Sequence, residues 1–479
     1  MEEYRRIADR VEAAVRDGRL RPGDRLPPQR VFARRHAIAN STAIRVYGEL
    51  ARRGLVVGEV GRGTFVRAAP PLPGPALAEA TGAAPVDLQL NYPVAEGQSA
   101  LMAPGLAALA RSDVLAEAVA RPAAATGTPE AREAAAAVLA RPGWAPDPDA
   151  VLFAGNGRQA IAAALAALVP PGGRLGVEAL TYPLVKAVAE TLGIRLVPLA
   201  LDEEGVRPEA LAAAHRAAPL AAVYLQPTLH NPLSATAGEE RRAALAELLR
   251  STDLTAVEDT TWAFLLPDAP APLAAHAPER VLLVDSLSKR LAPGLTVGYL
   301  VVPGRFRAAV AEALRSGAWT AGGLALAAAT RWTGDGTVAE VVAAKRADTA
   351  ARHALVRRRL AGQTVRTSPH AYHCWWELPA PWRAETFVAA AAARAGVAVT
   401  PGGAFAVGGR DDTGTAPDAV RIGLASPPPA VLDEVADGQP RGEPLGEAVD
   451  EEDPLGGVRG QRRGRVGKEE GPGGVLDGG

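Results

Sequence analysis

The chain has 479 residues, of which 48% are hydrophobic and 22% charged, so it is long and apolar enough for two or three domains with buried cores. Its formal net charge of -1 points to no polyanionic partner for the chain as a whole. The single cysteine, Cys374, excludes an intrachain disulfide framework and a multi-cysteine metal site, and we expect no metal. Without an apolar leader or a strongly apolar span, we expect a soluble cytoplasmic protein that does not enter a membrane.

The charge is unevenly spread along the chain. Residues 1–70 hold 15 arginines against 8 acidic residues, a net charge of +7, whereas residues 431–479 hold 6 basic and 12 acidic residues, a net charge of -6. A small basic segment on a near-neutral body is typical of a protein in which only that segment meets a polyanion. The alternative is a solvated helical face, which charge alone would favour.

Composition also predicts the domain borders. A basic head spans residues 1–67 and is followed by a proline-rich linker, 68–85, which should be semi-extended. A body with alternating helical and strand-like patterns spans 86–430. The segment 437–479 has almost no large apolar residues, so we expect a disordered tail there.

The head reads as three helices followed by two short strands. Apolar residues at helical spacing, turn residues and glycines predict helices over Tyr4–Arg16, Gln29–His36 and Ala43–Arg53, and strands over Leu55–Val57 and Thr64–Val66. In the third helix we expect Ile44, Tyr47 and Leu50 to face inward. The segment Gly58–Gly63 between the strands would form a small glycine-rich wing.

Three sequence blocks of the head, residues 18–30, 47–57 and 61–66, resemble in order the GntR-type winged helix-turn-helix DNA-binding domain. Short polar groups and one guanidinium stand at the start of the third helix, where such a helix meets base edges in the major groove: Asn40, Ser41, Thr42 and Arg45. The resemblance places Arg30, Arg62 and Gly63 at the DNA face as well. For each arginine alone, simple solvation is the alternative.

The body is expected to be an α/β domain with a mainly parallel sheet. Strand-like runs are Ala150–Phe153, Arg174–Val177, Arg195–Pro198, Ala221–Leu225, Thr255–Val257, Val281–Val284 and Thr296–Val302, with alanine-rich helices between several of them. Such a sheet binds its ligand at the carboxyl ends of the strands.

Chemically competent residues follow those strands. Lys289, one of only four lysines, comes directly after a strand, where a partly desolvated amine can form a Schiff base with an aldehyde. Asp259 follows another strand, and a carboxylate there can keep a pyridine nitrogen protonated. Asn231 offers an amide, Tyr182 a ring for stacking, and Arg421 a bidentate grip on a carboxylate. The run 155–161 opens a helix whose free N–H groups can hold a phosphate.

The order and spacing of these residues resemble the fold-type I aminotransferases, which use pyridoxal 5'-phosphate. The resemblance implies that Lys289 carries the cofactor, Asp259 meets its pyridine nitrogen, Asn231 its phenolic oxygen and Tyr182 its ring. It also implies that the phosphate is held around Asn156, Gly157, Arg158, Ser286 and Ser288, and that Arg421 binds a substrate carboxylate. Taken singly, these residues read as a turn, a loop, a cap or surface charges.

A GntR-type head on an aminotransferase-like body is the arrangement of the MocR/GabR-type transcriptional regulators. The sequence departs from that pattern at three positions. Thr296 stands where an arginine usually neutralises the cofactor phosphate, Pro122 where a tyrosine usually reaches across the dimer, and Trp262, expected beside the cofactor, where a tyrosine is usual. Losing the arginine would cost about 1.5–3 kcal/mol of cofactor binding, which Arg158 or Arg290 would compensate.

We therefore expect a homodimeric DNA-binding transcription regulator that acts on paired operator sites and whose body senses an amino-acid-like effector through pyridoxal 5'-phosphate. Two alternatives stay open at this point. One is a working aminotransferase with an accessory DNA-binding head, and the other is a regulator that binds no cofactor.

Overall fold

The computed structural model describes residues 3–16, 19–20, 24–52, 55–59, 63–66, 86–120, 123–407 and 417–432. They belong to two compact units, a head of residues 3–66 and a body of residues 86–432. The expected linker 68–85, the expected tail 437–479, and residues Pro122 and Arg62 lie outside the described residues.

The head consists of three helices and a small antiparallel sheet with the strand order β1-β3-β2. Its elements are α1 (Glu3–Arg16), β1 (Arg25–Leu26), α2 (Gln29–Arg35), α3 (Asn40–Arg52), β2 (Val56–Glu59) and β3 (Gly63–Val66). The three expected helices and two expected strands are therefore present, and α3 begins three residues earlier than expected. One apolar cluster joins the helices, with Val11, Phe32, Val46 and Leu50 at its centre.

The expected inward position of Ile44 is wrong, because its side chain is 49% exposed. The buried stripe of α3 consists of Ala43, Val46, Tyr47 and Leu50, which recur at the i, i+3, i+4 and i+7 spacing of one helix face. Ile44 lies about 100° away from Ala43 around the helix and falls outside that stripe.

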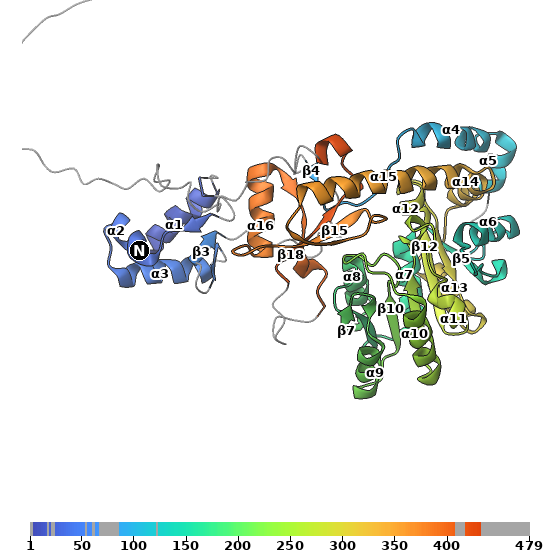
Figure 1. The fold of residues 1–479 in the computed structure, drawn as a ribbon, viewed down its shortest axis with the longest axis horizontal. Coiled ribbons are helices and arrows are strands. Elements are labelled where there is room, and N and C mark those ends of the chain that lie inside the picture. The colour runs from blue at the N-terminus through green and yellow to red at the C-terminus, as the bar shows by residue number, and fades with distance from the viewer. Residues whose placement is uncertain are drawn as a thin grey trace, which may run out of the picture. The chain divides into compact units, whose positions relative to one another are not determined.

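The body is built on a seven-stranded sheet with the order β5-β13-β12-β11-β10-β6-β7 (Figure 1). Only β13 runs antiparallel to its neighbours. Its strands are β5 (Val151–Ala154), β6 (Arg174–Glu178), β7 (Arg195–Leu199), β10 (Ala222–Leu225), β11 (Ala256–Asp259), β12 (Val281–Ser286) and β13 (Gly298–Val301). All seven strand-like runs of the sequence thus occur in this one sheet, with ends shifted by one or a few residues.

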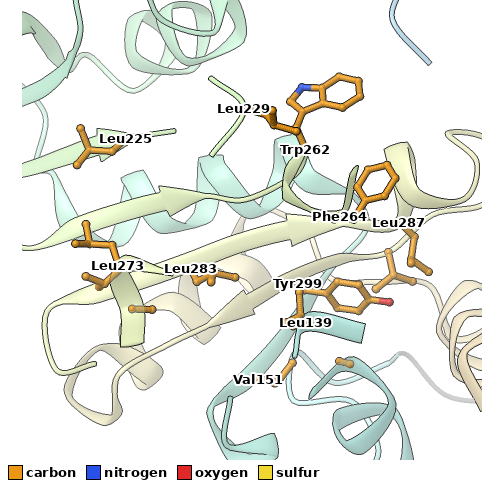
Figure 2. Close-up of a cluster of buried hydrophobic side chains, with 14 of the residues drawn as sticks. Leu139, Val151, Leu225, Leu229, Trp262, Phe264, Leu273, Leu283, Leu287 and Tyr299 are labelled. Carbon is orange, nitrogen blue, oxygen red and sulfur yellow. The ribbon is translucent and has the colours of Figure 1, made fainter. Parts of the chain in front are cut away.

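Both faces of this sheet are buried, which explains why its strands read as continuous apolar runs. Along β12, Leu283 packs into one core cluster, shown in Figure 2, while its neighbours Leu282 and Val284 pack into the cluster on the other face. Helices between the strands cover the two faces: α7 (Gly157–Leu168), α8 (Pro183–Thr191), α9 (Pro208–Ala217), α10 (Glu239–Ser251), α11 (Leu273–His276), α12 (Leu287–Arg290) and α13 (Gly304–Ser316).

The segments before β5 and after α13 complete the body. The helices are α4 (Gln98–Leu109), α5 (Ser112–Val119), α6 (Pro129–Leu139), α14 (Gly323–Gly334), α15 (Thr337–Arg359) and α16 (Ala384–Ala390), with short turns η1 (Pro148–Ala150), η2 (Ala263–Leu265), η3 (Ala391–Ala395) and η4 (Gly402–Ala404). A second sheet, antiparallel and of order β14-β15-β18-β17, contains β14 (Thr364–Thr367), β15 (His373–Glu377), β17 (Thr400–Pro401) and β18 (Ala419–Gly423). Two small pairs join β4 (Val86–Asp87) to β16 (Val397–Ala398) and β8 (Leu201–Asp202) to β9 (Gly205–Val206).

This topology gathers the candidate residues at one edge of the large sheet. Because β6, β10, β11 and β12 are parallel neighbours, their carboxyl ends lie side by side, and the residues that follow them share that edge. The first turn of α7, which follows β5, opens at the same edge.

Candidate functional site

Lys289 lies in the short helix α12, directly after β12. Its ammonium nitrogen donates to the backbone oxygen of Asn91 at 2.5 Å and sits 3.4 Å from the ring centroid of Tyr92. The indole of Trp262 lies on another side, 5.2 Å away. Burial, and then the positive charges of Arg421 and Arg158, hold the pKa of Lys289 well below its usual value. A larger share of the amine is therefore neutral, the form that attacks a carbonyl.

Asp259, at the end of β11, is fixed by three hydrogen-bond donors. Its carboxylate accepts from the Tyr224 hydroxyl at 2.6 Å, the Gln226 side-chain amide at 2.9 Å and the Thr261 N–H at 2.9 Å. The side chain is 4% exposed. The carboxylate thus has one preset orientation at the strand end.

Gln226 also joins Asp259 to Asn231. While its amide N–H donates to Asp259, its oxygen accepts from the Asn231 backbone N–H at 3.3 Å. The Asn231–Pro232 peptide bond is cis, and the Asn231 side-chain oxygen is buried with no hydrogen-bond partner among the described residues. Sequence reasoning missed Gln226 and Tyr224, because neither belongs to a recognisable motif.

The start of α7 lies against the end of β12. Asn156 caps the helix, since its side-chain oxygen accepts from the Gln159 N–H at 3.0 Å. A Cβ atom at Gly157 would stand 3.0 Å from the Ser286 hydroxyl, so glycine is what lets these segments approach. The first N–H groups of a helix have no acceptor within the helix and attract anions. Asn156, Gly157 and Ser286 are therefore brought together as an anion cradle.

Arg158 follows in the same turn and reaches two tyrosines. It donates to the Tyr92 hydroxyl at 2.9 Å, and its charge acts on the Tyr182 phenol. Burial raises the pKa of Tyr182 to about 12, although the Arg158 charge opposes the shift. Tyr182 is thus a neutral phenol beside a cation, and Tyr92, which the sequence reading did not single out, completes this side of the site.

Arg421, in β18, has two guanidinium nitrogens without a hydrogen-bond acceptor among the described residues. One nitrogen donates to the Gln89 backbone oxygen at 2.8 Å and to the Thr400 hydroxyl at 3.3 Å. Its Nε and Nη1 are buried without a partner among the described residues. Burial lowers the pKa of Arg421 to about 10, so it is charged at neutral pH. A buried guanidinium with unpaired N–H groups is suited to a carboxylate.

The substituted positions also have defined partners. The Thr296 and Ser288 hydroxyls are 2.9 Å apart, in the place where the family pattern has an arginine. Arg290 forms a buried ion pair with Asp285 at 2.8 Å, so it cannot replace that arginine. The expectation that Arg290 compensates is therefore wrong in its geometry, and Arg158 remains.

Two histidines near the candidate residues, His373 and His230, are buried and neutral. His373 is fully buried and its ring centroid lies 5.9 Å from that of Trp262. Burial lowers the pKa of His373 to about 3 and that of His230 to about 4, so both are neutral. Within the described residues, no three His, Cys, Asp or Glu side chains gather as metal ligands would.

In the head, the predicted base-reading residues lie at the exposed start of α3. Asn40, Ser41 and Arg45 are exposed and Thr42 is half-buried. The Arg45 guanidinium lies over the ring of Tyr4, 4.2 Å from its centroid. Since Tyr4 belongs to α1, this contact brings the start of α1 next to the exposed start of α3. The exposed Ile44 precedes Arg45 in the same turn and offers an apolar contact of the kind that a thymine methyl group takes.

Arg30 and Gly63 line one hollow of about 370 Å³, together with Arg25, which the sequence reading did not single out. Gly63 has a φ of +122°, and a Cβ atom there would stand 2.8 Å from the Arg25 guanidinium. The backbone at this point therefore requires glycine, and it brings the strand β3 close to two cations.

The fold and its site define a two-part protein, a winged helical head and an aminotransferase-type body, and comparison with known proteins agrees. Residues 95–438 match the family described as aminotransferase class I and II, and residues 3–66 match the bacterial regulatory proteins of the gntR family. The chain belongs to the aminotransferase class I and II family, in the composite form that carries a gntR-type head, that is, to the MocR/GabR-type transcriptional regulators. Its recognition from the sequence is thus confirmed.

Several of the similar proteins are named as transcriptional regulators. The chain is 29% identical over 425 residues to the uncharacterized HTH-type transcriptional regulator YdeF of Bacillus subtilis, covering 88% of this chain and 90% of that one. It is 30% identical to the HTH-type transcriptional regulator TauR of Rhodobacter capsulatus, covering 65% and 69%, and 27% identical to the pyridoxine biosynthesis regulator PdxR of Corynebacterium glutamicum, covering 62% and 65%.

Solved structures show the same fold at low identity. An archaeal alanine:glyoxylate aminotransferase matches with a TM-score of 0.66 and 21% identity, covering 82% of this chain and 93% of that one. The α-aminoadipate aminotransferase LysN of Thermus thermophilus matches with a TM-score of 0.65 and 21% identity, covering 73% and 90%.

The described helices include none long and apolar enough to cross a bilayer.

Proposed function

We propose that this transcription regulator binds pyridoxal 5'-phosphate on Lys289 and senses an amino-acid-like effector there. The observation that carries the proposal is that one edge of the sheet holds both the Lys289 amine, fixed against Asn91 and Tyr92 with its pKa lowered by burial, and an Asp259 carboxylate oriented by three donors. Two relatives add support: LysN was solved with a phosphopyridoxyl-leucine adduct, and PdxR is named for pyridoxine biosynthesis.

The residues present fit this cofactor. The free N–H groups at the start of α7 and the Ser286 hydroxyl suit its phosphate, and the Asn231 side-chain NH2 group is a donor that suits its phenolic oxygen. Asp259 would face the ring nitrogen, with Tyr182 and Trp262 beside the ring. When bound, the cofactor supplies an aldehyde and an electron-withdrawing ring.

The chain's own residues would select the effector. The unpaired Nε and Nη1 of Arg421 would grip a carboxylate, and Lys289 would exchange its position with the effector's amine. Both Arg421 and Asp259 are more than nine-tenths buried, so water competes little for their hydrogen bonds. A compound with one amine and one carboxylate would meet both requirements, since its amine would take the place of Lys289 and its carboxylate would bind Arg421.

Effector binding would then shift the body between two packings and change how two heads meet paired operator sites. The effector must bind one packing more tightly than the other by about 5.5 kcal/mol to move the ratio of the two populations from 1:99 to 99:1. We further propose that the protein acts as a homodimer in the cytoplasm, because paired sites call for two heads.

The test is a visible absorbance spectrum of the purified protein with and without added pyridoxal 5'-phosphate. We expect a new band that is absent in Lys289→Ala and retained in Lys186→Ala, a lysine outside the site. A protein that stays colourless with saturating cofactor would remove the sensing half of the proposal and leave DNA binding intact.

Aminotransferase turnover is the second candidate function, because Lys289, Asp259 and Arg421 occupy one site. Incubation with amino acids and 2-oxoglutarate separates the two. Release of several equivalents of oxo acid per chain indicates an enzyme, and release of one equivalent or less indicates a sensor.

A further inference from the structure

A second cavity lies behind the candidate site, and the sequence reading gave no sign of it. Its volume is about 290 Å³, and it opens between the end of α6, the turn η2 and the helix α15. Three arginines contribute to its wall, Arg141, Arg290 and Arg346, and no acidic residue lines it. Such a wall is unusual, because clustered cations repel one another unless an anion joins them.

Two of these arginines, Arg141 and Arg346, have N–H groups that donate to no acceptor among the described residues. The Arg141 guanidinium makes no hydrogen bond or ion pair within the described residues, and its Nη1 is buried without a partner. Arg346 uses its Nε to donate to the Phe264 backbone oxygen at 2.7 Å. The third, Arg290, is already paired with Asp285.

Neighbouring acidic groups offset the charge of Arg141 only in part, because Glu258 and Asp285, which oppose the fall in its pKa, are paired with other arginines. Asp285 is engaged by Arg290 at 2.8 Å, and Glu258 is engaged by the buried Arg242 at 3.3 Å. Burial lowers the pKa of Arg141 to about 10, so it still carries its charge at neutral pH. A half-buried cation without a hydrogen-bonded counter-ion is costly, and an anion in the cavity would relieve that cost.

The rest of the wall is apolar. Phe264, labelled in Figure 2, lines the cavity together with Leu266, Val338 and Val342. A volume near 300 Å³ is at the lower end of small-molecule sites. The cavity therefore combines a cationic end with an apolar body of limited size.

We propose that this cavity, the back pocket, binds a small organic anion whose oxyanion group meets Arg141 and Arg346 and whose apolar part packs on Phe264. The site is separate from the one around Arg421. Its wall residues Ala263, Arg290 and Arg346 directly follow Trp262, Lys289 and Lys345 in the chain, so it backs onto the Lys289 segment. The proposal stands whether or not pyridoxal 5'-phosphate binds.

The test is isothermal titration of the full-length protein, saturated with pyridoxal 5'-phosphate, with benzoate in one arm and inorganic phosphate in the other. All measurements use an Arg421→Gln background, so that the other carboxylate site does not contribute. We expect benzoate to bind, and to bind at least about tenfold more weakly after Arg141→Gln, because one charge-assisted contact is lost. Arg216→Gln, on the exposed surface of α9, is the matched control and should leave binding unchanged.

Ala339→Phe is an independent variant, because it fills the cavity and leaves every arginine in place. Ala339 is an exposed wall residue of α15, so the fold should tolerate the larger side chain. Loss of benzoate binding in this variant supports the proposal. Phosphate binding that depends on Arg141 would identify a phosphate group as the preferred oxyanion. The proposal is overturned if neither anion binds, or if binding is the same in Arg141→Gln and Ala339→Phe as in their background.

Discussion

The ammonium of Lys345 donates to the backbone oxygen of Lys289 at 3.0 Å. It also donates to the oxygens of Arg290 at 3.0 Å and Leu291 at 2.7 Å, so one fully buried side chain of α15 caps the C-terminal end of α12. A four-residue helix has few N–H donors of its own to satisfy its carbonyl groups, so the last of these need donors from elsewhere. Lys345 is therefore a positioning residue for Lys289, and its charge also helps to lower the pKa of that amine.

The first prediction concerns Lys345→Met. The three carbonyl groups would lose their donor, which should destabilise the protein by about 1–3 kcal/mol in denaturant unfolding. Removing the charge should raise the pKa of the Lys289 nitrogen, and because that nitrogen would be bonded to the cofactor in the loaded protein, a pH titration of the visible band should report the rise.

Lys186→Met is the matched control for this experiment. Lys186 also donates to backbone oxygens, those of Ala404 at 2.9 Å and Ala406 at 2.8 Å, but its charge does not act on Lys289. It should lower stability and leave the titration unchanged. Equal titrations in both variants would contradict the role of Lys345.

The second prediction restores the missing phosphate partner. In Thr296→Arg, a guanidinium would stand beside Ser288, where the family pattern has one, and a charge-assisted contact of about 1.5–3 kcal/mol should tighten cofactor binding about ten- to hundredfold. Equilibrium titration of pyridoxal 5'-phosphate measures the change. The same substitution at the exposed Thr191 should have no effect, and an unaltered affinity in Thr296→Arg would show that this position does not face the phosphate.

The third prediction concerns pH and Glu178, at the end of β6. Burial raises its pKa to about 8, although a hydrogen bond from the Gln226 N–H opposes the shift. Because the folded pKa lies above the unfolded one, the folded state holds the proton more tightly, and its contribution to stability is lost as pH rises from about 4.5 to about 8. Glu178→Gln cannot ionise, so its stability relative to the original protein should increase over that interval.

Urea unfolding at several pH values tests this. Glu178→Leu also cannot ionise, but it loses the acceptor for the Gln226 N–H, so it should be less stable than Glu178→Gln at every pH. A constant difference between Glu178→Gln and the original protein across pH 5–8 would rule the explanation out.

The fourth prediction concerns the head. Arg30→Ala should weaken operator and non-specific DNA alike and should reduce the slope of log affinity against log salt by about 1, because one phosphate contact is lost. Fluorescence anisotropy at several salt concentrations measures both quantities. Arg216→Ala, in the body, should leave the slope unchanged.

The fifth prediction separates base reading from phosphate contact. Arg45→Ala should lower the preference for operator over non-specific DNA by about 1–3 kcal/mol, provided that its guanidinium reads a base edge. Competition binding with scrambled DNA gives this ratio. A uniform loss on all sequences would assign Arg45 to the backbone instead.

The sequence predicted the local elements well, for identifiable reasons. Apolar runs bounded by turn residues marked all seven strands of the large sheet. The runs are continuous where a strand is buried on both faces, whereas the edge strand β7 is partly exposed. Motif residues beside those strands, Lys289 and Asp259 among them, could be found because each directly follows a strand. Tyr47 and Leu50 are buried as expected, and the position of Ile44 was wrong because a spacing of three residues, continued over two turns, drifts off a stripe that repeats every 3.6 residues.

By itself, the sequence determined the two-part architecture, the parallel sheet and the identity of the residues at its carboxyl edge, since these depend on periodicity and order along the chain. Only the tertiary structure decided which distant residues meet them. Asn91 and Tyr92 approach Lys289 from about 200 positions earlier, Lys345 caps α12 from about 55 positions later, and Arg141 joins the back pocket wall from the turn that follows α6. Contacts of this kind arise from the packing of whole elements, and no local pattern encodes them.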